Sequence, residues 1–182
     1  MTHIMLDIET LGTKPGAAIV SIGACVFSQE GIGDTHYQAI DIKAGSNGLA
    51  WPTFDPGTIA WWMDQSVEAR AVFKDSRSMH IVPALHGFRD WCHSHGETGI
   101  YLWCHGASFD APIVEAAFEA LWHKDQVPWK FWNIRCTRTL YDVAGVRPER
   151  TAGTQHNALD DAVAQAKAVI AGYVALGKTL SA

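Results

Sequence analysis

The segment His3-Ile4-Met5-Leu6-Asp7-Ile8-Glu9-Thr10-Leu11-Gly12 decides how the chain is interpreted. It opens as a short apolar run, typical of a buried β-strand, and then places two carboxylates, Asp7 and Glu9, two residues apart. Side chains two apart on a strand point to the same face of the sheet. Like charges in an apolar strand are costly unless cations neutralise them, and carboxylate oxygens are ligands that Mg²⁺ and Mn²⁺ prefer. From these residues alone, a metal site and an ordinary strand end explain the pair equally well.

The pattern outward from this strand predicts an α/β domain. Residues 18–27 and 35–42 form two more β-rich runs, and the short connections between them favour an antiparallel meander. Asp55-Pro56 resembles an N-cap followed by proline in the first turn, so we expect a helix from there toward Phe73. Helical spacing and strand-like runs then alternate, with helices expected near 81–92, 108–121, 137–145 and 158–176 and strands at 99–104 and 128–136. Meander strands followed by alternating helices and strands predict a mixed sheet covered by helices.

Length and composition predict one domain over residues 1–182. A chain of 182 residues with 48% hydrophobic residues can bury a substantial core without disulfides. The four cysteines form no C-x-x-C pair, and this suits reduced thiols, so we expect a cytoplasmic protein. The N-terminal residues do not read as a signal peptide, and no apolar run approaches membrane-spanning length.

The formal net charge of −5 argues against nucleic-acid binding by a broadly basic surface. It does not exclude a phosphodiester substrate, because divalent cations in a carboxylate-rich pocket reverse the local charge. A group of basic residues precedes His156 and can line a phosphate path, although half or more of such charges are usually just solvated. We leave this group outside the predicted site; its members are Lys130, Arg135, Arg138, Arg147 and Arg150.

Three further residues have side chains suited to acid–base or metal chemistry. Asp110 follows a predicted strand and the Gly-Ala-Ser-Phe loop, at the carboxyl end where open α/β sheets commonly place functional groups. Taken alone, it is better explained as a helix cap. His156 and Asp161 lie about one helical turn apart, and by themselves they too can be ordinary residues of a helix start.

The joint pattern of these residues resembles the DnaQ-like DEDDh exonuclease family. Asp7-Ile8-Glu9-Thr10-Leu11-Gly12 looks like the first motif, D-x-E-T-x-G, and Ser108-Phe109-Asp110 resembles the second. His156 with Asp161 matches the third, H-x4-D, in the family's order, whereas Asp160 falls out of this register and is assigned to solvent. The strings at 58–66 and 135–140 are similar to the exonuclease VIII-like and phage-type branch, which includes small exoribonucleases.

The resemblance implies an RNase H-like three-layer fold, with a mixed five-stranded sheet, and a 3′→5′ exonuclease that releases nucleoside 5′-monophosphates. It implies two Mg²⁺ or Mn²⁺ ions, with Asp7 bridging them, Glu9 and Asp161 completing the first site and Asp110 supporting the second. His156 would take the proton from the attacking water. Two cations can stabilise both the attacking and the leaving oxygen of an in-line displacement at phosphorus, and carboxylate side chains suit such cations. The expected catalytic set is therefore Asp7, Glu9, Asp110, His156 and Asp161, of which the four carboxylates would bind metal.

Substrate contacts are less clearly indicated. Leu11 and Gly12 resemble the family's contacts to the 3′-terminal nucleotide, and Gly12 would let the backbone approach it closely, although an ordinary turn explains the glycine as well. Trp61 and Trp62 cannot both face the core, because neighbours on a helix diverge by about 100°. One of them would stack on a base, but a core or dimer contact is favoured, so a homodimer stays open.

A zinc site near Cys92-His93-x-His95 and Cys104-His105 is rejected, because the residues straddle a helix end and a strand without a recognised ligand spacing. The leading hypothesis is a metal-dependent exonuclease that acts on single-stranded DNA or RNA with a free 3′ end. An exoribonuclease that trims RNA 3′ ends would use the same five residues. A non-catalytic nucleic-acid-binding or assembly module is the alternative from another class.

Overall fold

The computed structural model describes residues 1–43, 51–96, 99–122, 126–149 and 156–180. Its centre is a five-stranded sheet with the order β3-β2-β1-β4-β5. The first three strands form an antiparallel meander, and β4 and β5 run parallel to β1. This confirms the predicted mixed sheet. The strands are β1 Thr2–Thr10, β2 Ile19–Ser28, β3 Gly31–Ala39, β4 Ile100–Cys104 and β5 Ile134–Cys136.

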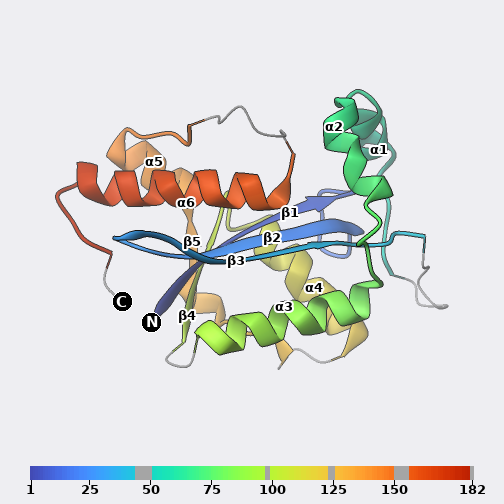
Figure 1. The fold of residues 1–182 in the computed structure, drawn as a ribbon, viewed down its shortest axis with the longest axis horizontal. Helices are drawn as coiled ribbons and strands as arrows, with labels where there is room; N and C mark the ends of the chain where they lie inside the picture. Colours follow the sequence, from blue (N-terminus) through green and yellow to red (C-terminus); the bar gives the residue numbers. More distant parts are fainter. Residues whose placement is uncertain (44–50, 97–98, 123–125, 150–155, 181–182) are drawn as a thin grey trace.

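Helices cover both faces of the sheet, which gives three layers (Figure 1). The α5 and α6 helices lie on one face, α3 and α4 lie on the other, and α1 and α2 stand at one end of the sheet. The helices are α1 Pro56–Met63, α2 Val67–Arg70, η1 Ala71–Lys74, α3 Ile81–His95, α4 Asp110–Leu121, η3 Phe131–Asn133, α5 Thr137–Ala144 and α6 Ala158–Ala175, where η marks a 3₁₀-helix.

Side chains of β1 alternate between the two helical layers. Ile4, Leu6 and Ile8 belong to the core cluster that contains α3 and α4, whereas Met5 packs in the cluster formed with α5 and α6. Because alternate residues of a strand share a face, Asp7 and Glu9 continue the face of Met5. Both carboxylates are therefore directed to the layer that contains α6.

The single helix expected from Asp55 to Phe73 is wrong, because the segment breaks into α1, α2 and η1. Asp55 does cap α1, since its side chain accepts a hydrogen bond from the Thr58 amide. The break follows from a second cap: the Ser66 hydroxyl accepts a hydrogen bond from the Ala69 amide and starts a new helix. A serine at an N-cap competes with helix continuation, because its side chain offers the backbone another partner.

Two other expected elements differ in their limits. The strand predicted for 128–136 is formed only over β5, and Phe131–Asn133 is a 3₁₀-helix instead. Phe131 and Trp132 are 76% and 63% exposed, so these aromatic residues have no sheet or core to pack against. The helix expected at 137–145 is α5, which begins at Thr137 with Cys136 at the N-cap. The third strand starts and ends a few residues earlier than expected, and the Gly-rich loop at 44–50 lies outside the described residues.

In the described part of the chain, no helix is both long and apolar enough to cross a membrane.

Candidate active site

The start of α6 lies against the strands that carry the first two carboxylates. Gly23 on β2 makes this approach possible, because a Cβ at this position would lie 2.2 Å from the Ala158 carbonyl carbon. Gly23 is paired with Asp7 across the β1–β2 ladder. Asn157 caps α6 by accepting hydrogen bonds from the Leu159 and Asp160 amides. The close packing thus places the first turn of α6 directly over Asp7 and Glu9.

Asp110 reaches the same place from the opposite layer. It is the first residue of α4, is only 2% exposed, and its Oδ1 accepts a hydrogen bond of 3.2 Å from the Ile8 amide. The β1–β4 ladder ends at Leu6 and Cys104, so Ile8 lies beyond the last strand partner on that side. The carboxylate therefore accepts from β1 just beyond the end of β4. It is not the helix cap considered above, because Phe109 is at the N-cap of α4 and no side chain caps this helix.

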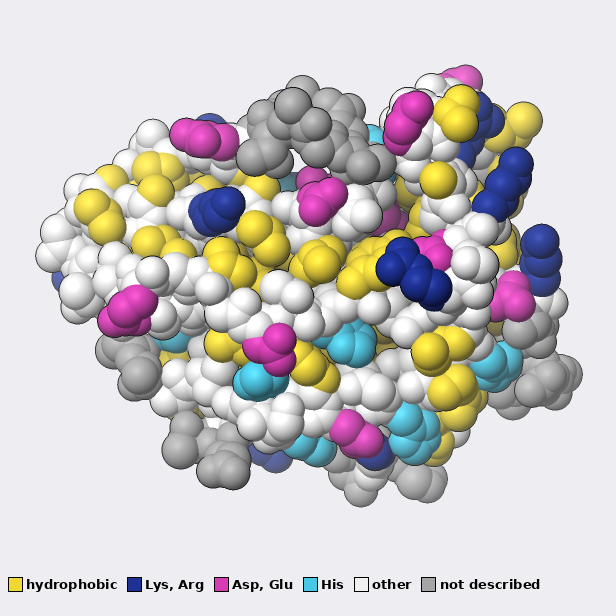
Figure 2. Space-filling view, viewed as in Figure 1, with side chains coloured by type: hydrophobic (Ala, Val, Ile, Leu, Met, Phe, Trp, Pro, Cys, Tyr) yellow, Lys and Arg dark blue, Asp and Glu magenta, His cyan; other side chains and the backbone are white. Residues whose placement is uncertain are grey.

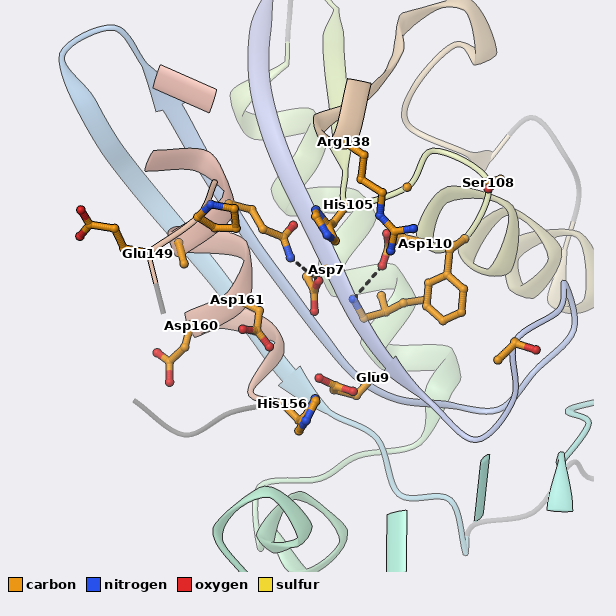
Figure 3. A pocket seen from close by; sticks show the side chains of 17 residues that line it. Asp7, Glu9, His105, Ser108, Asp110, Arg138, Glu149, His156, Asp160 and Asp161 are labelled. Carbon is orange, nitrogen blue, oxygen red and sulfur yellow. Dashed lines mark hydrogen bonds between the residues drawn. The ribbon is translucent and has the colours of Figure 1, made fainter. Parts of the chain in front are cut away.

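One cavity of about 780 Å³ brings the five predicted residues together (Figure 3). Asp7, Glu9, Asp161 and His156 point toward a common space. Glu149 and Asp160 also line the cavity, but their carboxylates are directed away from that space. Asp160 is exposed, as expected from the motif register. Leu11 and Gly12 do not line this cavity; Leu11 is buried in a cluster with Ala18, Val20 and Trp62.

The four carboxylates share an environment that opposes their ionisation. Burial is the main cause of a raised pKa at each of them. The pKa of Asp7 lies well above its ordinary value, because the charges of Asp110 and Glu9 add to burial. The pKa of Glu9 is raised to about 8 by burial and by the charges of Asp161 and Asp110, and that of Asp110 to about 7. Metal-free, the cavity stores electrostatic repulsion that bound cations would relieve.

His156 sits at the mouth of α6 in an unusual backbone conformation. Its φ of 65° lies in the left-handed region, which is uncommon for residues other than glycine. Two indole rings lie in T-shaped contact with the imidazole, with ring centroids 4.8 Å away for Trp61 and 6.2 Å for Trp62. Trp62 is 3% exposed and donates its indole N–H to the Thr10 carbonyl at 2.8 Å, whereas Trp61 is 43% exposed. As expected, the two tryptophans divide between core and surface, and the exposed one borders the cavity through His156.

The structure adds residues that the sequence interpretation left out. Gln165 donates a hydrogen bond of 2.7 Å to Oδ1 of Asp7. It lies four residues after Asp161, on the same face of α6, so helical spacing could have indicated it. Arg138 lines the cavity and lowers the pKa of Asp110. The other described members of the basic group do not line this cavity, and Arg150 lies outside the described residues.

The donor atoms at this site fit a metal ion. Ligand atoms of Glu9, His156 and Asp161 all lie within 4.8 Å of one another. Among the residues the structure describes, no other set of three His, Cys, Asp or Glu side chains comes this close together. Cys92 and Cys104, the two cysteines considered above for zinc, are both fully buried. A set dominated by carboxylate oxygens suits hard cations such as Mg²⁺ and Mn²⁺.

Residues 2–172 match the model of the 3′–5′ exoribonuclease Rv2179c-like domain family. The chain belongs to this family. It is a 3′–5′ exonuclease, a hydrolase of phosphodiester bonds. This exonuclease is also 27% identical over 185 residues to the exodeoxyribonuclease of Enterobacteria phage T4, an alignment that covers 90% of the chain and 82% of the phage protein.

Solved structures share the fold of this exonuclease. The nuclease domain of 3′hExo, a DEDDh family member bound to rAMP, has a TM-score of 0.59 at 13% identity, over 99% of this chain and 96% of that one. Exonuclease X in complex with 5′ overhanging duplex DNA has a TM-score of 0.53 at 18% identity, covering 96% and 93%. Product-bound exonuclease I has a TM-score of 0.58 at 14% identity, covering 96% and 43%. The expected RNase H-like fold is thereby confirmed, and DEDDh family members are metal-dependent.

Proposed function

We propose that this exonuclease removes nucleotides one at a time from the 3′ end of single-stranded nucleic acid, with Asp7, Glu9, Asp110, His156 and Asp161 as its active site. The observation that carries this proposal is the convergence of all five side chains on one cavity from three separate parts of the chain. Four buried or half-buried carboxylates with raised pKa values are too costly to be kept for stability alone.

The four carboxylates hold two divalent cations, Mg²⁺ or Mn²⁺, in this proposal. When bound, the cations neutralise the carboxylates and stabilise the negative charge on the phosphate during displacement. Gln165 fixes one oxygen of Asp7 by its hydrogen bond and so leaves the second oxygen directed toward the cavity. The Ile8 amide positions Asp110 in the same way.

His156 accepts the proton of the attacking water in the proposed reaction. The water oxygen forms the new bond to phosphorus, and the 3′ oxygen of the preceding nucleotide leaves, which yields a nucleoside 5′-monophosphate. The two indole rings pack against the imidazole, which lines the cavity. Imidazole is the side chain most often used as a general base close to neutral pH.

The backbone of Leu11 and Gly12 contributes to holding the terminal nucleotide. The segment directly follows β1. The Leu11 amide donates to the Ala18 carbonyl and the Leu11 carbonyl accepts from the Asp55 amide, so two hydrogen bonds hold the segment in place after Glu9. Its side chains do not supply the contact, because that of Leu11 is buried. All five proposed catalytic residues come from one copy of the chain, so a homodimer is not needed for this chemistry.

The sugar preference has two candidate answers. The family is described by exoribonuclease activity, whereas the phage T4 relative is an exodeoxyribonuclease. The family description favours RNA 3′-end trimming as the second candidate, which would use the same five residues.

A panel of 5′-end-labelled single-stranded DNA and RNA, with Mg²⁺ or Mn²⁺ and with chelator, tests the proposal. We expect stepwise shortening, nucleoside 5′-monophosphates as products, and no reaction in chelator. Asp161→Asn should abolish activity, whereas Asp160→Asn, which changes the exposed neighbour, should retain it. Equal activity of the two variants, or undiminished activity in chelator, would refute the assigned site.

A further inference from the structure

A second cavity adjoins the proposed active site and has a different charge. Its volume is about 890 Å³, and it shares His156 with the first cavity. Its walls come from β3, from the start of α6 and from the α2–η1 segment, Val67 to Lys74, together with the loop that follows. We call it the α2–η1 groove.

Two of the three cations that line the groove make no ion pair with a described residue. Arg70, Lys74 and Arg77 line it together with two acids, Glu68 and Asp75. Arg77 is already occupied, since its guanidinium makes two hydrogen bonds to Asp75, of 2.9 and 3.1 Å. Arg70 and Lys74 are exposed, and within the described part of the chain neither makes an ion pair. On the face drawn in Figure 2, Lys and Arg side chains gather on the side of α1 and α2.

Aromatic residues join the groove to the active site. Phe73 lines the groove and packs edge-on against Trp62 with ring centroids 5.0 Å apart, and Trp62 in turn borders His156. Tyr37 from β3 is half-buried in the opposite wall. Cations that follow a backbone beside aromatic rings are typical of grooves for single-stranded nucleic acid.

We propose that the α2–η1 groove holds the part of the substrate strand on the 5′ side of the terminal nucleotide, with Arg70 and Lys74 contacting its phosphates. This inference rests on the proposed function, because it needs the 3′ end in the acidic cavity. The two cavities meet at His156, so a strand whose terminal phosphate lies at that residue continues directly into the groove. In a chain of net charge −5, these two free cations attract phosphates locally, where a broadly basic surface is lacking.

The double variant Arg70→Ala/Lys74→Ala tests the groove, with Lys167→Ala/Lys178→Ala as the matched control. The control removes the same charge from exposed positions that line neither cavity. For a strand of about 12 nucleotides, long enough to fill such a groove, we expect KM to rise roughly 10- to 30-fold at moderate salt. The negative slope of log affinity against log salt concentration should become shallower by about 1.4, because each of the two lost phosphate contacts on a single strand contributes about 0.7. The control should do neither, and hydrolysis of a dinucleotide should be unchanged.

Binding measured without catalysis separates this inference from the proposed function. Fluorescence anisotropy of the same strand, labelled at its 5′ end, is recorded in chelator for the wild type and both double variants. Weaker binding of the groove variant alone supports the groove even if no hydrolysis is seen, in which case only the proposed function fails. The groove proposal is overturned if the two double variants bind and degrade the long strand equally well, or if the groove variant loses dinucleotide and long-strand hydrolysis to the same extent.

Discussion

At Asp7, burial and the charges of neighbouring carboxylates all act to raise the pKa. Only the hydrogen bond from Gln165 opposes them. A residue in this environment lowers the stability of the metal-free chain, and such local conflicts concentrate at functional sites. On the same face of β1, Met5 packs in the core, whereas the next two residues, Asp7 and Glu9, are acids.

The conflict at Glu9 predicts how metal-free stability depends on pH. Its pKa is raised from 4.5 to about 8 in the folded chain, chiefly by burial. The folded state therefore binds this proton more tightly than the unfolded state, and stability is lost as the pH rises from 4.5 to about 8. Glu9→Gln should raise the melting temperature in chelator at pH 8 by several degrees, at roughly 2–4 °C per kcal/mol for a chain of this size, with little effect near pH 5.

Glu119→Gln is the matched control for this experiment, because Glu119 is exposed on α4 and lines no described cavity. It should leave the pH dependence unchanged. If Glu9→Gln melted at the wild-type temperature at both pH values, burial would not be opposing the ionisation of Glu9.

The proposed role of His156 as general base predicts that turnover and metal binding respond differently to its removal. His156→Ala should lower kcat by about 10²–10⁴-fold, the usual contribution of a positioned base. Calorimetric titration should show nearly unchanged Mg²⁺ affinity, whereas Asp161→Asn should lower both quantities. Near-normal turnover of His156→Ala would show that His156 is not the general base. A large loss of metal affinity would instead make the imidazole a metal ligand, since its ring lies within reach of the ligand atoms of Glu9 and Asp161.

At the scale of elements, the sequence indicates those features that depend on local spacing. The face shared by Asp7 and Glu9 follows from the strand period, and the final helix is predicted within a residue of its end at Ala175. The break of the helix at Ser66 was missed, because apolar spacing continues across it. Trp62 was not assigned to the site, because its bond to the Thr10 carbonyl joins positions 52 apart in the chain, which no local pattern reports.

The contact of α6 with β2 predicts a strong effect of one methyl group. In Gly23→Ala the new Cβ would lie 2.2 Å from the Ala158 carbonyl carbon and 2.3 Å from the Leu159 amide nitrogen, so backbone must move. Overpacking of this kind costs about 1–3 kcal/mol or more. We expect a lower melting temperature and a loss of activity, because the displaced turn carries His156 and Asp161. Gly33→Ala is the control, since its Cβ would make ordinary contact, 3.5 Å from the Val26 carbonyl oxygen. Equal melting temperatures and activities for the two variants would contradict the close packing.

At the scale of the whole molecule, charge is distributed so that an acidic chain can act on a polyanion. The acidic cavity gathers negative charge that metal ions can neutralise. The α2–η1 groove, which shares His156 with that cavity, presents Arg70 and Lys74, and neither of them makes an ion pair with a described residue. The sequence predicted the acidic part, because its residues form spaced motifs. It did not predict the groove, because Arg70 and Lys74 become significant only when the fold places them in the walls of a cavity that His156 also lines.

This arrangement predicts that the enzyme starts only from a free 3′ end. The terminal nucleotide has to enter the cavity between β1, α4 and α6, and the strand can leave along the α2–η1 groove. A circular single strand offers no end, so we expect it to stay intact under conditions that degrade the same strand when linear. A linear strand with a blocked 3′ terminus should also persist, whereas blocking the 5′ terminus should have no effect. Gel analysis of the four substrates, with Mg²⁺ and equal enzyme, distinguishes these outcomes. Efficient cutting of the circle would show endonuclease action, and the cavity would then have to accept the middle of a strand.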